Sequence, residues 1–340
     1  MTKWIAGTFR TTDLVLSKGG KLPEAELAYI HTGELAADGS NVVLVTHGYT
    51  TGHHFVMPGS LAAEGSWSEL VGPGRAIDTD RFFVVSTNAL GSCYGSSGPA
   101  SIDPTTGAAY GDSFPRVTIT DTVRLQRVFL ESMGVTSLYA IAGPSMGGIQ
   151  AFQWGVQYPD WTDRLVVAVS GFESPARQGT TERGAFAEKI RAEPGWDGGR
   201  PGKGAIVPWL VQLRLHTLRE YCMDEALRDQ GLSDEDVDAR LNELAHQWAE
   251  GFHPWSLVSL GQAIGDYGVS DQLSRIKARV LLALCDNDRI FPASRGPELV
   301  HQLKAADVNV RFVKIPSRYG HLASGLDWQL WDRELREFLA

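Results

Sequence analysis

The stretch Ala142–Gly148 reads Ala-Gly-Pro-Ser-Met-Gly-Gly and decides how the rest of the chain is interpreted. An apolar run at 137–141 precedes it, and a run with helical spacing at 149–156 follows it. A Gly-x-Ser-x-Gly motif between a strand and a helix is typical of a sharp turn that exposes a nucleophilic serine. Small neighbours let the strand and the helix pass closely at such a turn. The pattern therefore predicts a nucleophile, Ser145, at a helix N-terminus, where free N–H groups favour a developing negative charge.

The composition bounds the classes of protein that the chain can belong to. Its 340 residues and 43% hydrophobic content suit one large α/β domain with an insertion, or at most two domains. The formal net charge of -9 argues against nonspecific binding to nucleic acid. The three cysteines form no paired motif, which favours a reducing cytoplasm. No apolar run approaches the ~20 residues that cross a bilayer, so we expect no membrane association.

The elements expected along the chain alternate between strands and helices. Strand patterns occur in an opening hairpin at 11–31 and at 41–46, 81–87, 137–141, 163–170, 279–284 and 310–315, and helical patterns occur at 120–133, 149–156, 210–227, 234–248 and 327–339. Alternating strands and helices predict a doubly wound, mostly parallel sheet. The helical character of 173–267 predicts an inserted helical cap, between a first part of the core at 1–172 and a second part at 268–340.

A serine nucleophile needs a base, and the base needs an orienting acid. Asp288 lies just past the strand at 279–284, and the Ile-Phe-Pro that follows it would anchor its loop, so we choose it as the acid. Asp286 is the alternative. His321 follows a glycine in the last strand-to-helix loop and is the predicted base. The order serine, acid, histidine is the one expected for this kind of fold.

The negative charge that forms on an attacked carbonyl oxygen needs two preset donors. We predict the backbone N–H of Met146, directly after the nucleophile, and the N–H of Tyr49, in the loop after the strand at 41–46. His53 and His54 follow in the same loop, but no carboxylate lies at a spacing that suggests a metal site.

Several stretches together resemble a known family. They are 77–85, the glycine-rich loop 88–99, the turn at 143–148, 288–292 and 319–321. In these stretches the chain resembles the homoserine O-acetyltransferases, α/β-hydrolase enzymes that acetylate homoserine from acetyl-CoA. The resemblance implies an α/β-hydrolase fold with Ser145, Asp288 and His321 as catalytic triad. It also implies a homodimer formed through the cap, with no metal and no other cofactor.

The resemblance carries departures that bear on the substrate. Arg214 and Tyr221 have the spacing of an arginine and a tyrosine that lie near the family's substrate. The family has an acid after the catalytic histidine, which helps to hold homoserine, whereas this chain has Leu322, and the turn has Pro144 where glycine is usual. An apolar leucine cannot pair with an ammonium group. These departures point to the family's esterase-like relatives, which pass the acyl group to water.

We therefore predict a cytoplasmic serine esterase that cleaves small, uncharged acyl esters through an acyl-enzyme. Residues expected at the substrate pocket are Leu90, Trp209, Arg214, Tyr221 and Leu322, although Arg214 could instead hold a carboxylate. The first alternative is a homoserine O-acetyltransferase that uses acetyl-CoA. The second is a binding protein without catalytic activity. Hydrolysis and transfer share the first half-reaction and differ in whether water reaches the acyl-enzyme.

Overall fold

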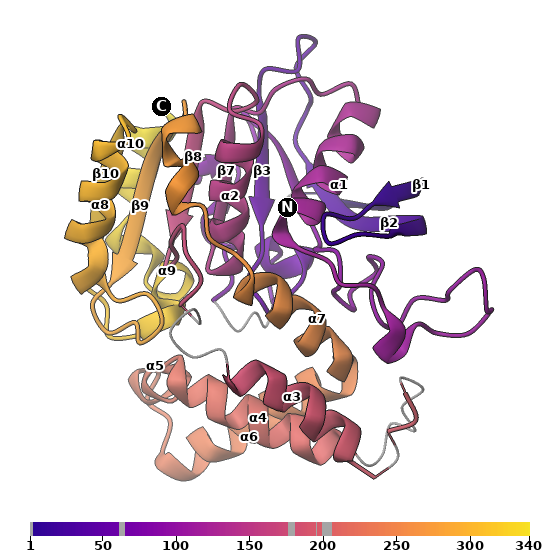
Figure 1. The fold of residues 1–340 in the computed structure, drawn as a ribbon. Helices are drawn as coiled ribbons and strands as arrows, with labels where there is room; N and C mark the ends of the chain where they lie inside the picture. Colours follow the sequence, from indigo (N-terminus) through magenta and orange to yellow (C-terminus); the bar gives the residue numbers. More distant parts are fainter. Residues whose placement is uncertain (1–2, 61–64, 176–180, 195, 199–205) are drawn as a thin grey trace.

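A computed structural model describes residues 3–60, 65–175, 181–194, 196–198 and 206–340, and it shows a central sheet with helices around it (Figure 1). The eight strands run across the sheet in the order β1 (Ile5–Val15), β2 (Lys21–Thr32), β6 (Phe83–Thr87), β3 (Val42–Thr46), β7 (Ala140–Pro144), β8 (Arg164–Ala168), β9 (Arg279–Cys285) and β10 (Val310–Ile315). β2 is antiparallel to both of its neighbours, and every pair from β6 to β10 is parallel. The predicted mostly parallel sheet is confirmed.

The remaining elements connect these strands. The helices are α1 (Ile119–Ser132), α2 (Met146–Gln157), α3 (Thr181–Ala192), α4 (Val207–Glu220), α5 (Met223–Asp229), α6 (Asp234–Gly251), α7 (Pro254–Gly265), α8 (Gly296–Ala305), α9 (Ala323–Leu326) and α10 (Asp332–Leu339). Short 3₁₀ segments lie at His53–Val56, Gly111–Ser113, Ser270–Arg275, Ala293–Arg295, Gly320–Leu322 and Trp328–Leu330. A small separate sheet pairs β4 (Val71–Gly72) with β5 (Ile77–Asp78).

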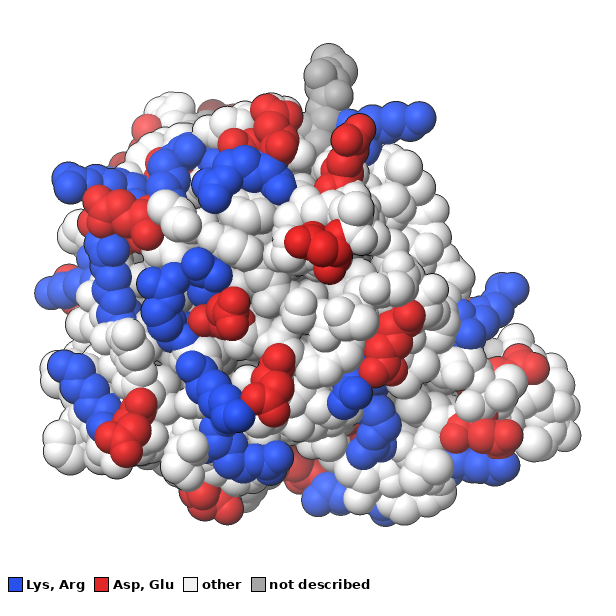
Figure 2. All heavy atoms as spheres, turned by 90° about the horizontal axis from the view of Figure 1, so that it is seen from above, with Lys and Arg blue, Asp and Glu red and all other residues white. Residues whose placement is uncertain are grey.

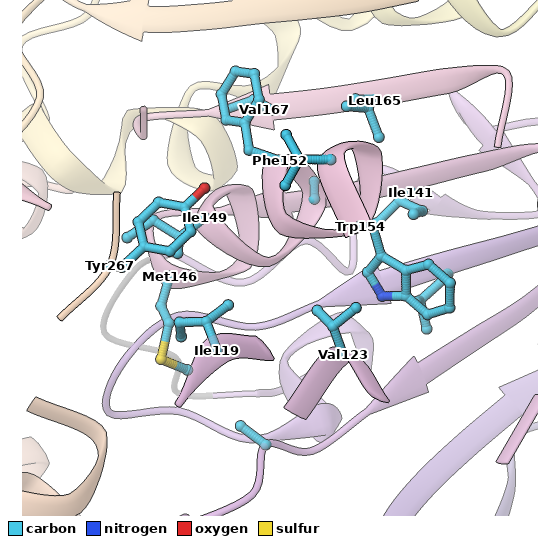
Figure 3. Close-up of a cluster of buried hydrophobic side chains, with 14 of the residues drawn as sticks. Ile119, Val123, Ile141, Met146, Ile149, Phe152, Trp154, Leu165, Val167 and Tyr267 are labelled. Carbon is cyan, nitrogen blue, oxygen red and sulfur yellow. The ribbon is translucent and has the colours of Figure 1, made fainter. Parts of the chain in front are cut away.

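The central strands are buried on both faces because successive side chains point to opposite sides of a sheet. Leu44 and Ile141 point into a core shared with α1, α2 and α8. Val43 and Ala140 point into a second core, which α10 covers. Figure 3 shows Phe152 and Trp154 of α2 in the first core, beside side chains of α1, β7 and β8. This double cover explains why these strands read as short, almost wholly apolar runs.

Helices α3, α4, α5 and α6 form a layer below the carboxyl ends of the parallel strands, toward which the arrow of β9 points in Figure 1. Leu210 and Leu215 of α4 pack with Leu241 and Ala245 of α6 in a separate apolar cluster. Helix α7 joins both parts, because Leu257 belongs to this cluster while Leu260 belongs to the first core of the sheet.

The chain leaves and re-enters the sheet region at neighbouring points. The N–H of Ser174 donates to the carbonyl of Tyr267 at 3.3 Å, and the N–H of Val269 donates to the carbonyl of Phe172 at 3.0 Å. The segment between them, which holds α3 to α7, is thus closed by two backbone hydrogen bonds. Its two connections lie side by side.

Some expected boundaries differ from the structure. The helix expected over 210–227 is two helices, because Cys222 between α4 and α5 has a left-handed backbone with φ of 64°. The helix expected over 327–339 begins only at Asp332, after a 3₁₀ turn at Trp328–Leu330. The opening hairpin begins earlier than expected, at Ile5. Helical spacing shows which residues share a face, and it does not show where the backbone turns.

The surface opposite the α3–α6 layer carries both signs of charge. Figure 2 shows lysine and arginine side chains interspersed there with aspartate and glutamate. Ion pairs such as Arg336–Asp332 and Arg311–Glu337 join charges of opposite sign within and beside α10. In the described parts of the chain, no helix is both long and apolar enough to span a bilayer.

Candidate functional site

Ser145 occupies a strained turn between β7 and α2. Its backbone has φ of 53° and ψ of -122°, a conformation that L-residues rarely adopt. The turn is held by the Ser145 N–H, which donates to the carbonyl of Ala168 at 3.0 Å, and by the hydroxyl of Ser170, which donates to the Ser145 carbonyl at 2.6 Å. Strain of this kind persists only where the surroundings enforce it, and it gathers at functional sites.

Glycines around Ser145 allow the close approach of neighbouring backbone. A Cβ atom on Gly147 would lie 2.2 Å from the carbonyl oxygen of Thr46, and one on Gly143 would lie 2.5 Å from that same atom. A Cβ on Gly148 would lie 2.6 Å from the side chain of Ser170. Each distance is too short for a larger residue. The motif is therefore a steric requirement of packing α2 against β3 and β8.

Asp288 and His321 come together from the loops after β9 and β10. Nδ1 of His321 lies 2.9 Å from Oδ2 of Asp288, and the other carboxylate oxygen accepts the N–H of Ile290 at 2.8 Å. Both side chains are buried, with 1% of His321 and 2% of Asp288 exposed. A carboxylate only accepts hydrogen bonds, so it places the imidazole proton on Nδ1 and the lone pair on Nε2. Asp286 instead is half-exposed and pairs with Lys314 at 2.9 Å.

A cavity of about 220 Å³ lies between the sheet edge and the α3–α7 segment. Ser145, Met146 and Tyr49 line it from the core, and Arg214 and Tyr221 line it from α4 and its end. The structure thus brings five of the predicted site residues to one cavity. His321 lies beside its wall, because its ring is 5.0 Å from that of Tyr221 and 6.3 Å from that of Phe291.

Three residues predicted as pocket walls lie elsewhere and do not line this cavity. Leu90 is fully buried in the first core of the sheet. Trp209 lies against the ring of Phe186, with 6.1 Å between the ring centres. Leu322 is fully buried in apolar contact with Tyr221. Leu322 is thus not part of the cavity wall itself, but it packs against Tyr221, which is.

Most of the other described lining residues were not among the predicted site residues, and two of them, Thr50 and Trp248, contact Arg214. Thr50 accepts a hydrogen bond from Nη1 of Arg214 at 3.0 Å, and Trp248 of α6 lies with its ring centre 4.8 Å from the Arg214 guanidinium. Nε1 of Trp248 also donates to the Thr50 carbonyl at 3.1 Å. Thr50 directly follows the predicted donor Tyr49, and this position is the sequence feature that could have identified it as a site residue. Trp248 was only one of several tryptophans in the cap region.

The loop after β3 carries two buried histidines. Burial lowers the pKa of His47 to about 4 and that of His53 to about 3, so both rings are neutral at neutral pH. Nδ1 of His47 lies 2.7 Å from the carbonyl oxygen of Gly48, which can only accept, so this nitrogen carries the proton. The contact orients the peptide that ends in the N–H of Tyr49. Among the described residues, no group of three or more histidine, cysteine or acidic side chains is placed to hold a metal ion.

Comparisons with known proteins agree with this architecture. The family model described as "alpha/beta hydrolase fold" matches residues 41–327. The homoserine O-acetyltransferase of Methanosphaerula palustris is 35% identical over 91% of this chain and 68% of its own length. That of Caulobacter vibrioides is 34% identical over 98% of this chain and 94% of its own. These names favour the predicted alternative, acetyl transfer, over ester hydrolysis.

Solved structures include both kinds of enzyme. Homoserine O-acetyltransferase from Bacillus anthracis superposes with a TM-score of 0.87 at 25% identity, over 100% of this chain and 98% of that one. Esterase E22 superposes with a TM-score of 0.86 at 25% identity, over 99% of this chain and all of that one. Because the relatives are enzymes, the binding-protein alternative is not retained. The chain belongs to the α/β-hydrolase fold family and, within it, to the homoserine O-acetyltransferase-like enzymes, which include acyltransferases and esterases.

Proposed function

We propose that this enzyme is a serine esterase that hydrolyses short acyl esters through an acyl-enzyme on Ser145. One observation carries the choice of water over homoserine: the cavity that holds Ser145 contains Arg214, and no aspartate or glutamate is among the described residues that line it. Homoserine presents both a carboxylate and an ammonium group. Arg214 suits the carboxylate, but a buried ammonium without an acidic partner costs several kcal/mol.

The proposed reaction uses Ser145, His321 and Asp288 as triad. The Ser145 hydroxyl attacks the ester carbonyl while Nε2 of His321 takes its proton. The N–H groups of Met146 and Tyr49 hold the resulting oxyanion, and the alcohol leaves with the proton from His321. Water then attacks the acyl-enzyme, with His321 again as base. Asp288 orients the imidazole through Nδ1 in both steps. The 2.9 Å contact between Asp288 and His321 supports this assignment.

The substrate proposed here is a short ester that is neutral or carries a carboxylate. Arg214 is only 3% exposed and lines the same cavity as Ser145. A buried guanidinium is suited to hold a carboxylate through charge-assisted hydrogen bonds. The proposed substrates therefore include esters that carry a carboxylate, in addition to the uncharged esters expected from the sequence. They are included because the charged residue Arg214 lines the cavity of the nucleophile, whereas the apolar residues Leu90 and Trp209 do not.

The second candidate function is acetyl transfer from acetyl-CoA to homoserine. The curated relatives at 34–35% identity over more than nine tenths of the chain favour it. Both candidates share the acyl-enzyme on Ser145. They differ in the acceptor of the acyl group, so only a test with both acceptors separates them.

A single set of assays tests the proposal. The purified enzyme is supplied with a short p-nitrophenyl ester in water and, separately, with acetyl-CoA plus homoserine, and the Ser145→Ala variant serves as the control for both. We expect Ser145-dependent hydrolysis of the ester and little O-acetylhomoserine. Formation of O-acetylhomoserine at a kcat/KM of about 10⁴ M⁻¹s⁻¹ or more would establish the transferase instead.

We further propose that two copies pair through the helices of the cap, as the resemblance implies. Light scattering coupled to size exclusion would give the mass in solution. A mass equal to a single chain at micromolar concentration would contradict pairing.

A further inference from the structure

A second cavity, of about 450 Å³, is lined in part by Arg214 and Trp248, which also line the cavity that holds Ser145. Among the described lining residues, these two are the only ones that both cavities share. One side chain of α4 and one of α6 therefore border both cavities.

The second cavity offers apolar surface next to these two side chains. Leu218, Met223, Leu227 and Leu244 contribute to its lining, and Gln230 and Arg240 contribute polar groups. Leu218 and Leu227 are buried in the apolar cluster of the α3–α6 layer. A hydrocarbon chain that entered this space from the Ser145 side would bury apolar surface against these leucines.

Trp248 is held in its place by three contacts. Its Nε1 donates to the carbonyl of Thr50 at 3.1 Å, its ring lies 4.8 Å from the guanidinium of Arg214, and it stacks on Phe252 with 4.6 Å between ring centres. A large aromatic ring fixed on three sides does not swing aside at low cost. The ring is therefore a fixed part of the wall of the Ser145 cavity.

We propose that Trp248 is the residue that limits the length of the substrate's chain by closing the Ser145 cavity off from the second one. This inference rests on the proposed esterase function and specifies its substrates as esters of short acyl chains. Chains that end at Arg214 and Trp248 fit, and longer chains meet the ring. The indole also connects α6 to Thr50 through its hydrogen bond. The size of the ring is thus expected to affect chain-length preference, and the hydrogen bond is expected to affect the position of Thr50.

The test is a chain-length series of p-nitrophenyl esters, from acetate to decanoate, with the full-length enzyme and its variants. For the wild type we expect kcat/KM to fall steeply once the acyl chain exceeds the depth of the first cavity. For Trp248→Ala we expect the optimum to move to longer chains, with a gain of about fourfold in the long-to-short ratio for each methylene that becomes buried.

Two further variants separate the effect of size from other effects. Trp248→Phe keeps a ring but loses the donor to Thr50, so it should keep the short-chain profile while its kcat falls by a few fold. Trp209→Ala removes a tryptophan of the same layer that lines neither cavity, and its profile should match that of the wild type. If Trp248→Ala unfolds, Trp248→Leu is measured in its place.

An unchanged chain-length profile in a folded Trp248→Ala or Trp248→Leu enzyme would overturn the inference. So would an equal shift in Trp209→Ala, because the effect would then be a general loosening of the cap. Either result leaves the proposed function standing as long as acetate ester hydrolysis still depends on Ser145. If the Ser145→Ala variant instead hydrolysed the acetate ester as fast as the wild type, the proposed function would be overturned.

Discussion

Ser145 and Arg214 line the same cavity, but they reach it by different routes. The turn at Ser145 takes its shape from residues within 143–148 and from the strands that touch them, because each glycine there meets backbone or a short side chain closely. Arg214 is placed by the packing of α4 on α6 and by contacts with Thr50 and Trp248. One half of the site is thus set by local sterics, and the other half by helices that are distant in sequence.

Substitutions in the two halves of the site should therefore have different effects. In the proposed mechanism the half around Ser145 carries the reaction, so changes there should abolish turnover of every substrate. We propose that the half around Arg214 sets selectivity, so changes there should act on some substrates and spare others.

The largest effect is expected for Ser145→Ala. Removing the nucleophile should lower kcat at least ~10⁴-fold for every ester and every acceptor, because no acyl-enzyme can form. Steady-state kinetics with a short p-nitrophenyl ester measure it, and circular dichroism checks that the fold is retained. Activity of the folded variant near that of the wild type would remove Ser145 from the mechanism.

The next effect separates the two candidate acids. Asp288→Asn should lower kcat by about 10²- to 10⁴-fold, because an amide can leave His321 in the wrong tautomer. Asp286→Asn should stay within about twofold, since Asp286 pairs with Lys314 at the surface. The same ester assay compares the two variants. The reverse ranking would make Asp286 the acid despite its pairing with Lys314.

A smaller and substrate-dependent effect is expected for Arg214→Leu. For a short ester whose acyl chain ends in a carboxylate, kcat/KM should fall by about 100-fold, because a charge-assisted hydrogen bond to the substrate is lost. The methyl-ended counterpart should change far less. The ratio of the two substrates is the measurement, since any disturbance of Thr50 or Trp248 affects both. Equal losses would assign Arg214 a purely structural role.

The smallest effect concerns pH and stability. His47 and His53 have pKa values lowered to about 4 and about 3 by burial, so the unfolded chain binds more protons than the folded one below the ordinary pKa of 6.5. Their contribution to stability is therefore complete above pH 6.5 and is lost as the pH falls toward 4. We expect the free energy of unfolding to fall by about 1.4 kcal/mol per pH unit for each histidine in that window.

Urea denaturation at several pH values measures this slope, and His53→Asn supplies the comparison. The variant should show a shallower loss of stability between pH 6 and pH 4, because one buried titrating group is gone. An identical slope in variant and wild type would mean that His53 is already protonated in the folded protein. That outcome would also contradict the lowered pKa of His53, to which burial and the neighbouring His54 contribute.

The predictability of the site follows the same division. The sheet and the contact between Asp288 and His321 could be expected from the sequence, because short apolar runs and loop residues after strands are local patterns. The choice of Asp288 over Asp286 matches the contacts, since Ile290 donates its N–H to the Asp288 carboxylate. The division of 210–227 into two helices could not be foreseen, because Cys222 gives no local sign of its left-handed backbone.

The wall of the cavity was harder to predict for a similar reason. Leu90 and Trp209 have the apolar character expected of pocket residues, yet one packs in the sheet core and the other packs against Phe186. Which of several tryptophans faces the nucleophile depends on how α4 and α6 cross. That crossing is a property of the assembled cap, and helical spacing contains no information on it.

The paired hydrogen bonds between 172–174 and 267–269 have a consequence for how such enzymes can be modified. Because both ends of the intervening segment emerge at one point, the segment could be exchanged there without parting β8 from β9, as long as the new segment keeps Leu260 of α7 in the first core. A different helical insert could be grafted at the same point. The turn at Ser145 and the strands around it would then remain unchanged as the scaffold. The segment between 174 and 267 could then be varied, in evolution or by engineering, to change substrate selectivity without changing the residues that carry out the reaction.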